Sequence, residues 1–258
     1  MIEEPYRWVE AIANRREYIE TQLATGTPIV ALGCREGIVF VALGSGRQKI
    51  FEIYDRIAMG AIGHPGDIER LRMAAIELAS TEGFTRSAAD VSLRRLAYYS
   101  LSPVMKNAFE QVYGAPYLAR LLFAEIGPKE EDDLFLRVEY DGSIATNAAM
   151  PGSARESFAV ISGTRDSTAA LESQLRSEYS SGAKLSRALA TAIDALVAAQ
   201  VRGPVSDGGD EPAHRIAAVR DEHLRAGAIE AGLLERSSGH AIRYRTLSQG
   251  EIQSALAR

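Results

Sequence analysis

The residues of this chain that could do chemistry match none of the common catalytic or metal-binding patterns. There is no Gly-x-Ser-x-Gly turn for a serine nucleophile and no His-Glu-x-x-His zinc motif. The histidines fall in expected turns or flexible stretches and lack the spacing of metal ligands: His64, His214, His223 and His240. The single cysteine, Cys34, excludes an internal disulfide, and its apolar neighbours predict a buried small side chain. Neither a metal nor a cofactor is therefore expected.

The segment Gly44-Ser45-Gly46 has the composition of a phosphate-binding loop. Such loops place the phosphate at the N-terminus of a helix, where the helix dipole attracts an anion. Here the following residues have the pattern of a strand, which indicates an ordinary β-turn instead.

Length and charge narrow the function classes further. The chain has 258 residues, 46% of them hydrophobic, and a formal net charge of −5. This length favours one domain spanning residues 1–258. A mildly acidic chain lacks the basic surface that nucleic-acid binding requires, so no nucleic acid is expected as a partner. The apolar runs are shorter than the ~20 residues of a membrane span, and the start Met-Ile-Glu-Glu does not resemble a signal peptide. These features predict a cytoplasmic protein that binds no membrane.

The first third of the chain predicts one helix followed by hairpins. Residues 6–24 have the apolar periodicity of an amphipathic helix, which Gly26-Thr27-Pro28 ends. Four short apolar runs follow in quick succession, which is typical of antiparallel hairpins: residues 29–34, 38–43, 50–54 and 57–62.

Helical periodicity then returns in residues 65–83 and 89–112, the second stretch divided or kinked at Pro103. Tyr98, Met105 and Phe109 give the second helix another apolar stripe, which predicts a partner beyond the protein's own sheet.

The remainder predicts strands, helices and loops in alternation. Strands are expected at residues 117–126, 134–140, 158–162, 227–234 and 242–247. Helices are expected at residues 168–179 and 183–201 and from about residue 249. The acidic residues 129–133 predict a solvated hairpin tip, residues 145–156 a loop, and residues 202–213 a flexible loop.

Two hairpin sets separated by helix pairs can bury their apolar faces in one economical way. The two antiparallel sheets stack on each other and the helix pairs cover their outer faces, which gives a four-layer αββα sandwich with an extra N-terminal helix.

Several segments resemble the proteasome subunit family, in the family's order along the chain. Residues 48–57, followed by Ala61-Ile62-Gly63, resemble the signature of two strands leading into the first helix. Residues 26–33 and 36–42 resemble the opening hairpin. Further segments resemble actinobacterial-type α subunits in particular: residues 116–125, 140–145 and 247–256. The resemblance spans about residues 6–257 and implies the αββα fold of the N-terminal-nucleophile hydrolases.

The resemblance implies a non-catalytic α-type subunit of a bacterial 20S proteasome. Such a subunit forms the outer heptameric ring, which controls the access of unfolded protein substrates to the proteolytic chamber. The implied partners are neighbouring α subunits, proteasome β subunits and a ring-shaped proteasomal ATPase or another bacterial activator.

The alternative is a self-processing threonine protease of the β type, because this fold also hosts such enzymes. Their chemistry requires an N-terminal threonine with nearby lysine and acidic side chains. Thr27 follows Gly26, as at the self-cleaved junction of catalytic subunits, and Lys49 aligns with their lysine. Leu43, however, occupies the position of the acid, so no catalytic residue is expected. A ring that has no β partner is a third possibility.

The resemblance also implies three functional regions. The C-terminal carboxylate of an activator would pair with Lys49 in a pocket formed with Gly26 and Gly63, with His64 at the rim. The gate would comprise Met1, Ile2, Glu3, Glu4 and Pro5, although the Tyr-Asp-Arg gate motif is missing. The loop with Val112, Tyr113 and Gly114 would line the pore.

Overall fold

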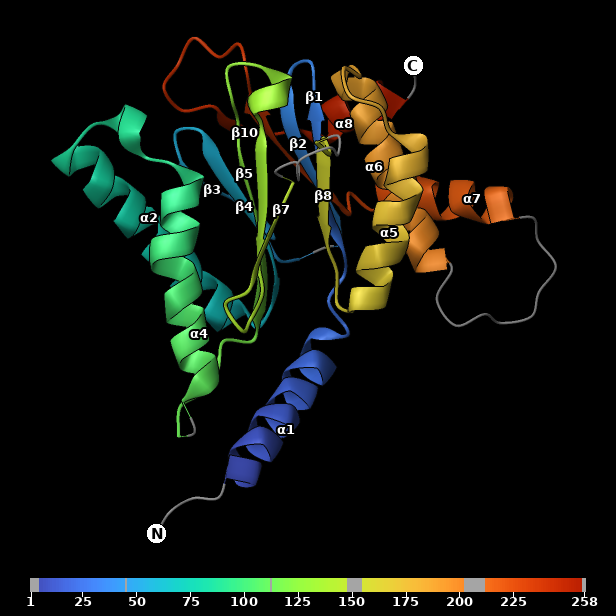
Figure 1. Ribbon diagram of the computed structural model, residues 1–258. Helices are drawn as coiled ribbons and strands as arrows, with labels where there is room; N and C mark the ends of the chain where they lie inside the picture. Colours follow the sequence, from blue (N-terminus) through green and yellow to red (C-terminus); the bar gives the residue numbers. More distant parts are fainter. Residues whose placement is uncertain (1–4, 45, 112, 148–154, 202–211, 257–258) are drawn as a thin grey trace.

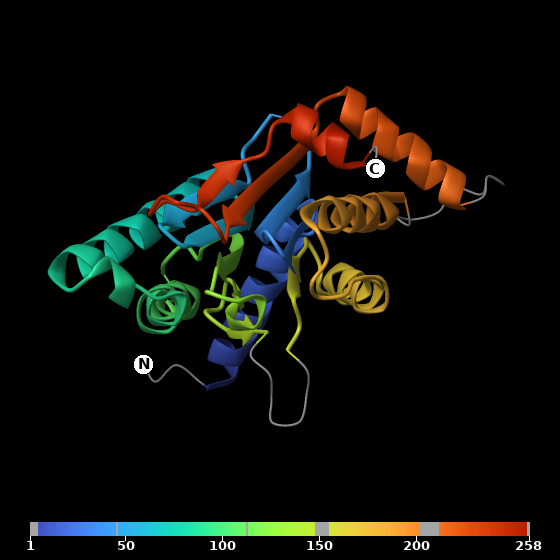
Figure 2. The same cartoon turned by 90° about the horizontal axis from the view of Figure 1, so that it is seen from above.

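Two antiparallel sheets lie face to face between two layers of helices (Figures 1 and 2). The computed structural model describes residues 5–44, 46–111, 113–147, 155–201 and 212–256. In spatial order, the first sheet contains β10 (Tyr244–Thr246), β9 (Ile229–Glu235), β2 (Gly37–Leu43), β1 (Ile29–Cys34) and β8 (Phe158–Ile161). The second contains β3 (Ile50–Tyr54), β4 (Ile57–Gly63), β5 (Ala119–Glu125), β6 (Leu134–Val138) and β7 (Ile144–Thr146). The predicted αββα sandwich is confirmed.

The two helix layers cover opposite outer faces (Figure 2). The second sheet is covered by α2 (Pro65–Thr85), α3 (Leu93–Leu96) and α4 (Ser102–Glu110), with a 3-10 turn at Ala88–Asp90. The first sheet is covered by α5 (Arg165–Glu178), α6 (Leu185–Val201), α7 (Pro212–Arg225) and α8 (Gln249–Leu256). The N-terminal helix α1 (Pro5–Leu23) projects from the end of the sandwich (Figure 1).

The strands of the first hairpin are buried on both faces. In β1, Ile29 and Ala31 pack between the two sheets, whereas Val30 and Cys34 pack against the helices. Double burial explains why these strands read as continuous apolar runs instead of alternating ones. The predicted burial of Cys34 is confirmed, and burial raises the pKa of its thiol to about 12.

The long helix predicted at residues 89–112 is interrupted near Pro103. A π-helical segment, Ala97–Leu101, joins α3 to α4. Pro103 has no N–H for the usual helical bond, so the backbone is irregular in the turn before it. The interpretation of the second apolar stripe was largely wrong, because Met105 and Phe109 are buried within the chain itself. Of that stripe, only Tyr98 is exposed.

The acidic segment 129–133 is more than a solvated tip. It forms a 3-10 turn at Glu130–Asp132, and the side chain of Asp133 is only 2% exposed. The Asp133 carboxylate accepts two hydrogen bonds of 2.8 Å from the Arg236 guanidinium. Burial of this carboxylate is possible because the arginine compensates its charge.

Two elements of the structure were missed in the sequence. Strand β7 occupies the start of the predicted loop at residues 145–156, and α7 begins at Pro212, inside the predicted loop at residues 202–213. The helix packs Ile216 and Val219 against α6, a stripe too sparse to stand out beside a Gly- and Pro-rich stretch. Residues 202–211 lie outside the described residues, and the single-domain prediction remains a prediction.

A buried arginine connects α1 to both sheets. Arg120, on β5, is 2% exposed and binds the carboxylates of Glu20 on α1 and Glu139 after β6, at 2.5 and 2.8 Å. Its Nη1 also donates to the carbonyl oxygens of Ser162 and Gly163, which follow β8 of the first sheet. We call these residues the Arg120 cluster. Nearby, Ile19 and Leu23 of α1 pack in one apolar cluster with Phe109 of α4 and Tyr140, which follows β6.

Removing the Arg120 side chain should therefore destabilise the chain strongly. R120A leaves Glu20, Glu139 and two carbonyl groups without their cation, so we expect a loss of about 3–5 kcal/mol in the free energy of unfolding. R165A is the control: Arg165 is exposed and reaches Glu20 at 3.5 Å, so its loss should cost about 0–1 kcal/mol. Urea unfolding followed by circular dichroism measures both, and similar losses for the two variants would contradict the assigned role.

Candidate functional site

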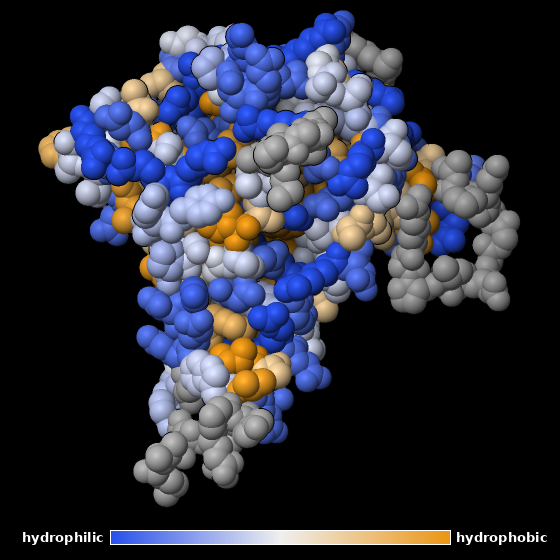
Figure 3. Space-filling view, in the orientation of Figure 1, coloured by the Kyte–Doolittle hydropathy of each residue, from blue (hydrophilic) through white to orange (hydrophobic). Residues whose placement is uncertain are grey.

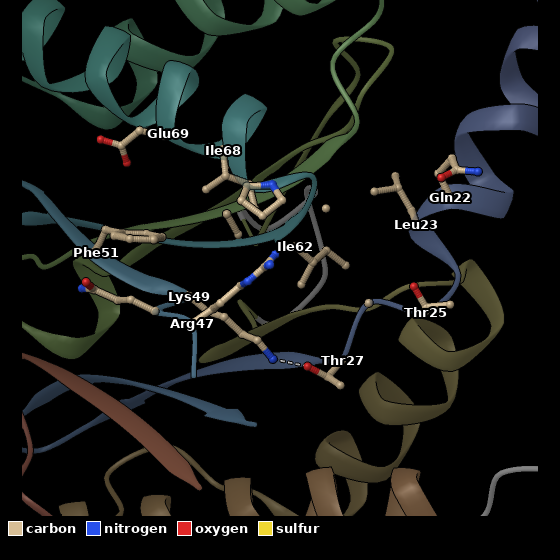
Figure 4. Close-up of a pocket in the computed structure, with 15 residues that line it drawn as sticks. Gln22, Leu23, Thr25, Thr27, Arg47, Lys49, Phe51, Ile62, Ile68 and Glu69 are labelled. Atoms are coloured by element: carbon tan, nitrogen blue, oxygen red, sulfur yellow. Dashed lines mark hydrogen bonds between the residues drawn. The ribbon is translucent and has the colours of Figure 1, made fainter. Parts of the chain in front are cut away.

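A cavity of about 590 Å³ opens where the end of α1 meets the beginning of β3 and of α2 (Figure 4). It is lined by apolar surface from α1, β4 and α2 and by the charged residues Arg47, Lys49 and Glu69. The predicted docking residues Lys49, Gly26 and Gly63 all line this one cavity. The structure thus brings together three positions that lie far apart in the sequence.

Lys49 extends along the floor of the cavity to the start of the first hairpin (Figure 4). Its Nζ donates a hydrogen bond to the Leu43 carbonyl oxygen at 2.8 Å and another to the Thr27 hydroxyl. Desolvation lowers the pKa of the Lys49 amine, and the nearby Glu230 carboxylate opposes this effect. The ammonium is therefore held by neutral oxygen atoms, with its compensating charge elsewhere.

That compensating charge, Glu230 on β9, was missed in the sequence. Its carboxylate accepts hydrogen bonds from the backbone N–H of Lys49, at 2.9 and 3.1 Å, and from that of Ile50 at 2.9 Å. The residues are about 180 positions apart. No local pattern signals a side chain that binds a distant backbone, so only the fold reveals it.

At Gly26 and Gly63, which line the cavity, any side chain would come too close to neighbouring atoms of the wall. Gly63 has a φ of +129°, and a Cβ there would lie 2.0 Å from the Leu118 carbonyl oxygen. A Cβ on Gly26 would lie 3.0 Å from the Leu23 carbonyl oxygen and 3.3 Å from Ile62. Both positions let the walls approach each other closely.

His64 lies beside the cavity but is not among the residues that line it. It is the N-cap of α2, and its Nδ1 accepts a hydrogen bond from the Gly66 N–H at 3.2 Å. This contact satisfies a free N–H of the first turn, which accounts for His64 structurally. Its predicted position at the rim remains a prediction.

The predicted pore loop leaves the end of α4 next to α1. Tyr113 is 98% exposed, and Val112 lies outside the described residues. The guanidinium of Arg15, on α1, donates to backbone carbonyl oxygens of α4 and this loop at 2.6–3.2 Å: those of Ala108, Phe109, Gln111 and Gly114. A cation at a helix C-terminus favours these carbonyls, so Arg15 fixes the loop to α1.

The predicted gate is largely outside the described residues, which begin at Pro5. Pro5 is the first described residue of α1, a position that suits proline because an N–H there would have no helical partner. The gate remains a prediction. Among the described residues, no three His, Cys, Asp or Glu side chains gather as a metal site. No helix in the same residues is long and apolar enough to cross a membrane.

Comparison with known proteins agrees with the fold. Residues 23–214 match the family model described as "Proteasome subunit". The chain belongs to the proteasome subunit family. Its relatives include proteins named "Proteasome subunit alpha" from Kineococcus radiotolerans, 31% identical over 87% of this chain and 94% of the relative, and from Acidothermus cellulolyticus, 32% identical over 96% and 94%. The protein of that name from Frankia alni is 30% identical over 88% and 85%.

Because some proteasome subunits use an N-terminal threonine as nucleophile, the surroundings of Thr27 bear on whether this chain could do the same. In the structure Thr27 follows Gly26, and its nitrogen is part of a peptide bond. Its hydroxyl donates to the Leu43 carbonyl oxygen at 3.2 Å, and the Leu43 side chain packs into the core beneath the helices of the first sheet. The threonine and the lysine meet, but no carboxylate stands at position 43.

Gly63 should be the more sensitive of two glycines with positive φ. G63A combines an unfavourable backbone with a clash against a carbonyl oxygen, so we expect a loss of more than about 2 kcal/mol in unfolding free energy. In the control G227A, φ is +61° and no atom lies within 4 Å of the new Cβ, so the cost should be about 1 kcal/mol. Thermal and urea unfolding compare the two, and equal costs would contradict the close approach at Gly63.

Proposed function

We propose that this chain is a non-catalytic α-type subunit of a 20S proteasome. It forms the outer heptameric ring, stacks on a ring of β subunits, limits the access of unfolded proteins and docks a ring-shaped ATPase or another activator. The cytoplasm is the compartment that fits this role. The observation that carries the proposal is the pairing of Thr27 and Lys49 without an acid at Leu43, behind a helix that is part of the fold.

The threonine-protease alternative would require removal of residues 1–26. That segment includes α1, whose Glu20 binds the buried Arg120 and whose last turns bury Ile19 and Leu23. Cleavage before Thr27 would release these contacts and leave Arg120 without one of its two carboxylates. The retained helix thus favours a structural role over a propeptide.

The cavity at Lys49 suits a C-terminal carboxylate. An ammonium group has three N–H donors, and Thr27 and Leu43 accept two of them. The third can bind a carboxylate oxygen, and the partial burial that lowers the pKa of Lys49 also strengthens such an ion pair. Gly26 and Gly63 line the same cavity and allow the close approaches within its wall.

The exposed apolar side chains of the described residues suit assembly. One group lies on α1: Trp8, Val9 and Tyr18. A second lies on α2, the π segment and α4: Met73, Leu78, Phe84, Tyr98, Tyr99 and Val104. Figure 3 also shows apolar surface where α1 approaches the lower end of α4. We assign the α1 group to neighbours in the ring and the second group, in which Phe84 is 93% exposed, to the β ring.

Co-expression with the β subunit encoded beside this chain tests the role of Thr27. We expect the chain to stay full-length by intact mass and to enter a roughly four-ring particle on gel filtration. Peptidase activity should appear in that particle and survive T27A unchanged. Loss of residues 1–26, together with loss of activity in T27A, would establish the protease alternative, and homo-heptamers that never recruit a β ring would refute the proposed stacking.

A docking measurement tests Lys49. The probe is an octapeptide with the C-terminal sequence of the ring-shaped ATPase encoded in the same genome, bound to the assembled particle. With the free carboxylate it should bind about 10–100-fold more tightly than its amidated form, because a charge-assisted hydrogen bond contributes about 1.5–3 kcal/mol. K49A should abolish this difference, whereas K129A, at an exposed tip, should preserve it. Equal binding to K49A and to the unmodified particle would refute docking at Lys49.

A further inference from the structure

We propose that Glu230 is a positioning residue of the docking site: its carboxylate fixes the backbone at Lys49 and places a negative charge behind the Lys49 ammonium. This inference rests on the proposed docking function of Lys49. Glu230 lies on β9 of the first sheet, whereas Lys49 directly precedes β3 of the second sheet.

The backbone contact solves a problem particular to an edge strand. β3 lies at the outer edge of the second sheet and pairs with β4 alone. The N–H groups of Lys49 and Ile50 would otherwise have no strand to bind, and unpaired backbone donors are costly when they are partly buried. The Glu230 carboxylate accepts both, at 2.9–3.1 Å.

Glu230 is itself held firmly by the first sheet. It lies on β9, opposite Ala42 of β2, and the next pair along the strands is Ile229 with Leu43. The Leu43 carbonyl oxygen is the group that binds the Lys49 ammonium. One corner of the first sheet therefore fixes Lys49 twice, at its backbone through Glu230 and at its Nζ through Leu43.

The carboxylate acts from behind the cavity and does not compete with a ligand. Glu230 is not among the residues that line the cavity. The charged groups on the cavity side are Arg47 and Glu69, and Glu69 is already bound by two hydrogen bonds to Arg72. A ligand carboxylate would thus approach Nζ from the open side, where Arg47 adds a second positive charge.

The electrostatics of the pair follow from burial. Desolvation lowers the pKa of Lys49 and raises that of Glu230, while the attraction between the two groups opposes both shifts. The backbone N–H bonds also favour the ionised carboxylate. Removing the Glu230 charge should therefore lower the pKa of Lys49 further and deprotonate the amine at a lower pH.

The first test measures the Lys49 amine directly and needs no docking ligand. The chain has four lysines, Lys49, Lys106, Lys129 and Lys184, so competitive acetylation with acetic anhydride across a pH series, read by peptide mass spectrometry, reports each one. In E230Q the Lys49 titration midpoint should fall by about one pH unit, with the other lysines unchanged. E235Q, which removes another carboxylate of β9, is the matched control and should leave Lys49 unchanged.

The second test follows docking of the same free-carboxylate octapeptide to the assembled particle across pH. E230Q should shift the loss of binding to lower pH by the same amount as the Lys49 midpoint, which weakens binding by up to about tenfold at pH values above that midpoint. A merely structural role would weaken binding equally at every pH. Coincident Lys49 titration curves in E230Q and the parent overturn the role of Glu230, whereas unchanged docking in K49A overturns the docking function instead.

Discussion

The buried guanidinium of Arg120 is the constraint on which the end of the molecule around the cavity depends. A fully buried cation is tolerated only with compensating charge and complete hydrogen bonding, and here the partners come from three elements: Glu20 on α1, Glu139 after β6 and the backbone after β8. The cluster therefore fixes how the sheets meet and at what position α1 leaves them. Since the last turn of α1 forms one wall of the cavity, the cavity's shape also depends on this arginine.

The cavity lies where the first and second hairpins come together, and its polar chemistry depends on the Lys49 amine, the Thr27 hydroxyl and the Leu43 carbonyl oxygen. Thr27 begins the first hairpin and Lys49 the second, so the fold alone brings the hydroxyl and the ammonium together. Position 43 of this arrangement is a leucine and not an acid. Its side chain packs into the core, so Leu43 contributes only its backbone carbonyl oxygen, which accepts a hydrogen bond from the ammonium. The threonine and the lysine therefore meet without a carboxylate at position 43, and the proposed ion pair with a ligand carboxylate rests on this.

The sequence predicted the parts of the structure that depend on local pattern. The doubly buried strands, the amphipathic α1 and the break at Pro103 each have a periodicity or a residue that signals them. The misinterpreted parts involve partners that are distant in the sequence. Asp133 belongs to an acidic run expected in solvent, but it is buried because Arg236 binds its carboxylate. Phe109 was expected at an interface, but α1, about 90 residues away in the sequence, covers it. Glu230 was missed for the same reason. Lys49, Gly26 and Gly63 were found through family resemblance, and the fold then placed them in one cavity.

Two arginines, Arg120 and Arg15, attach α1 to the rest of the chain at two places along its length. Near its C-terminal end the helix is held by Arg120 through Glu20, beside the cavity; farther toward its N-terminus, Arg15 holds the carbonyls of α4 and the loop with Tyr113. A helix rises about 1.5 Å per residue and bends little over such a short distance. A displacement of α1 at the cavity would therefore also move Arg15 and the loop bound to it. The cavity proposed for docking and the loop with Tyr113 are thus connected by one helix.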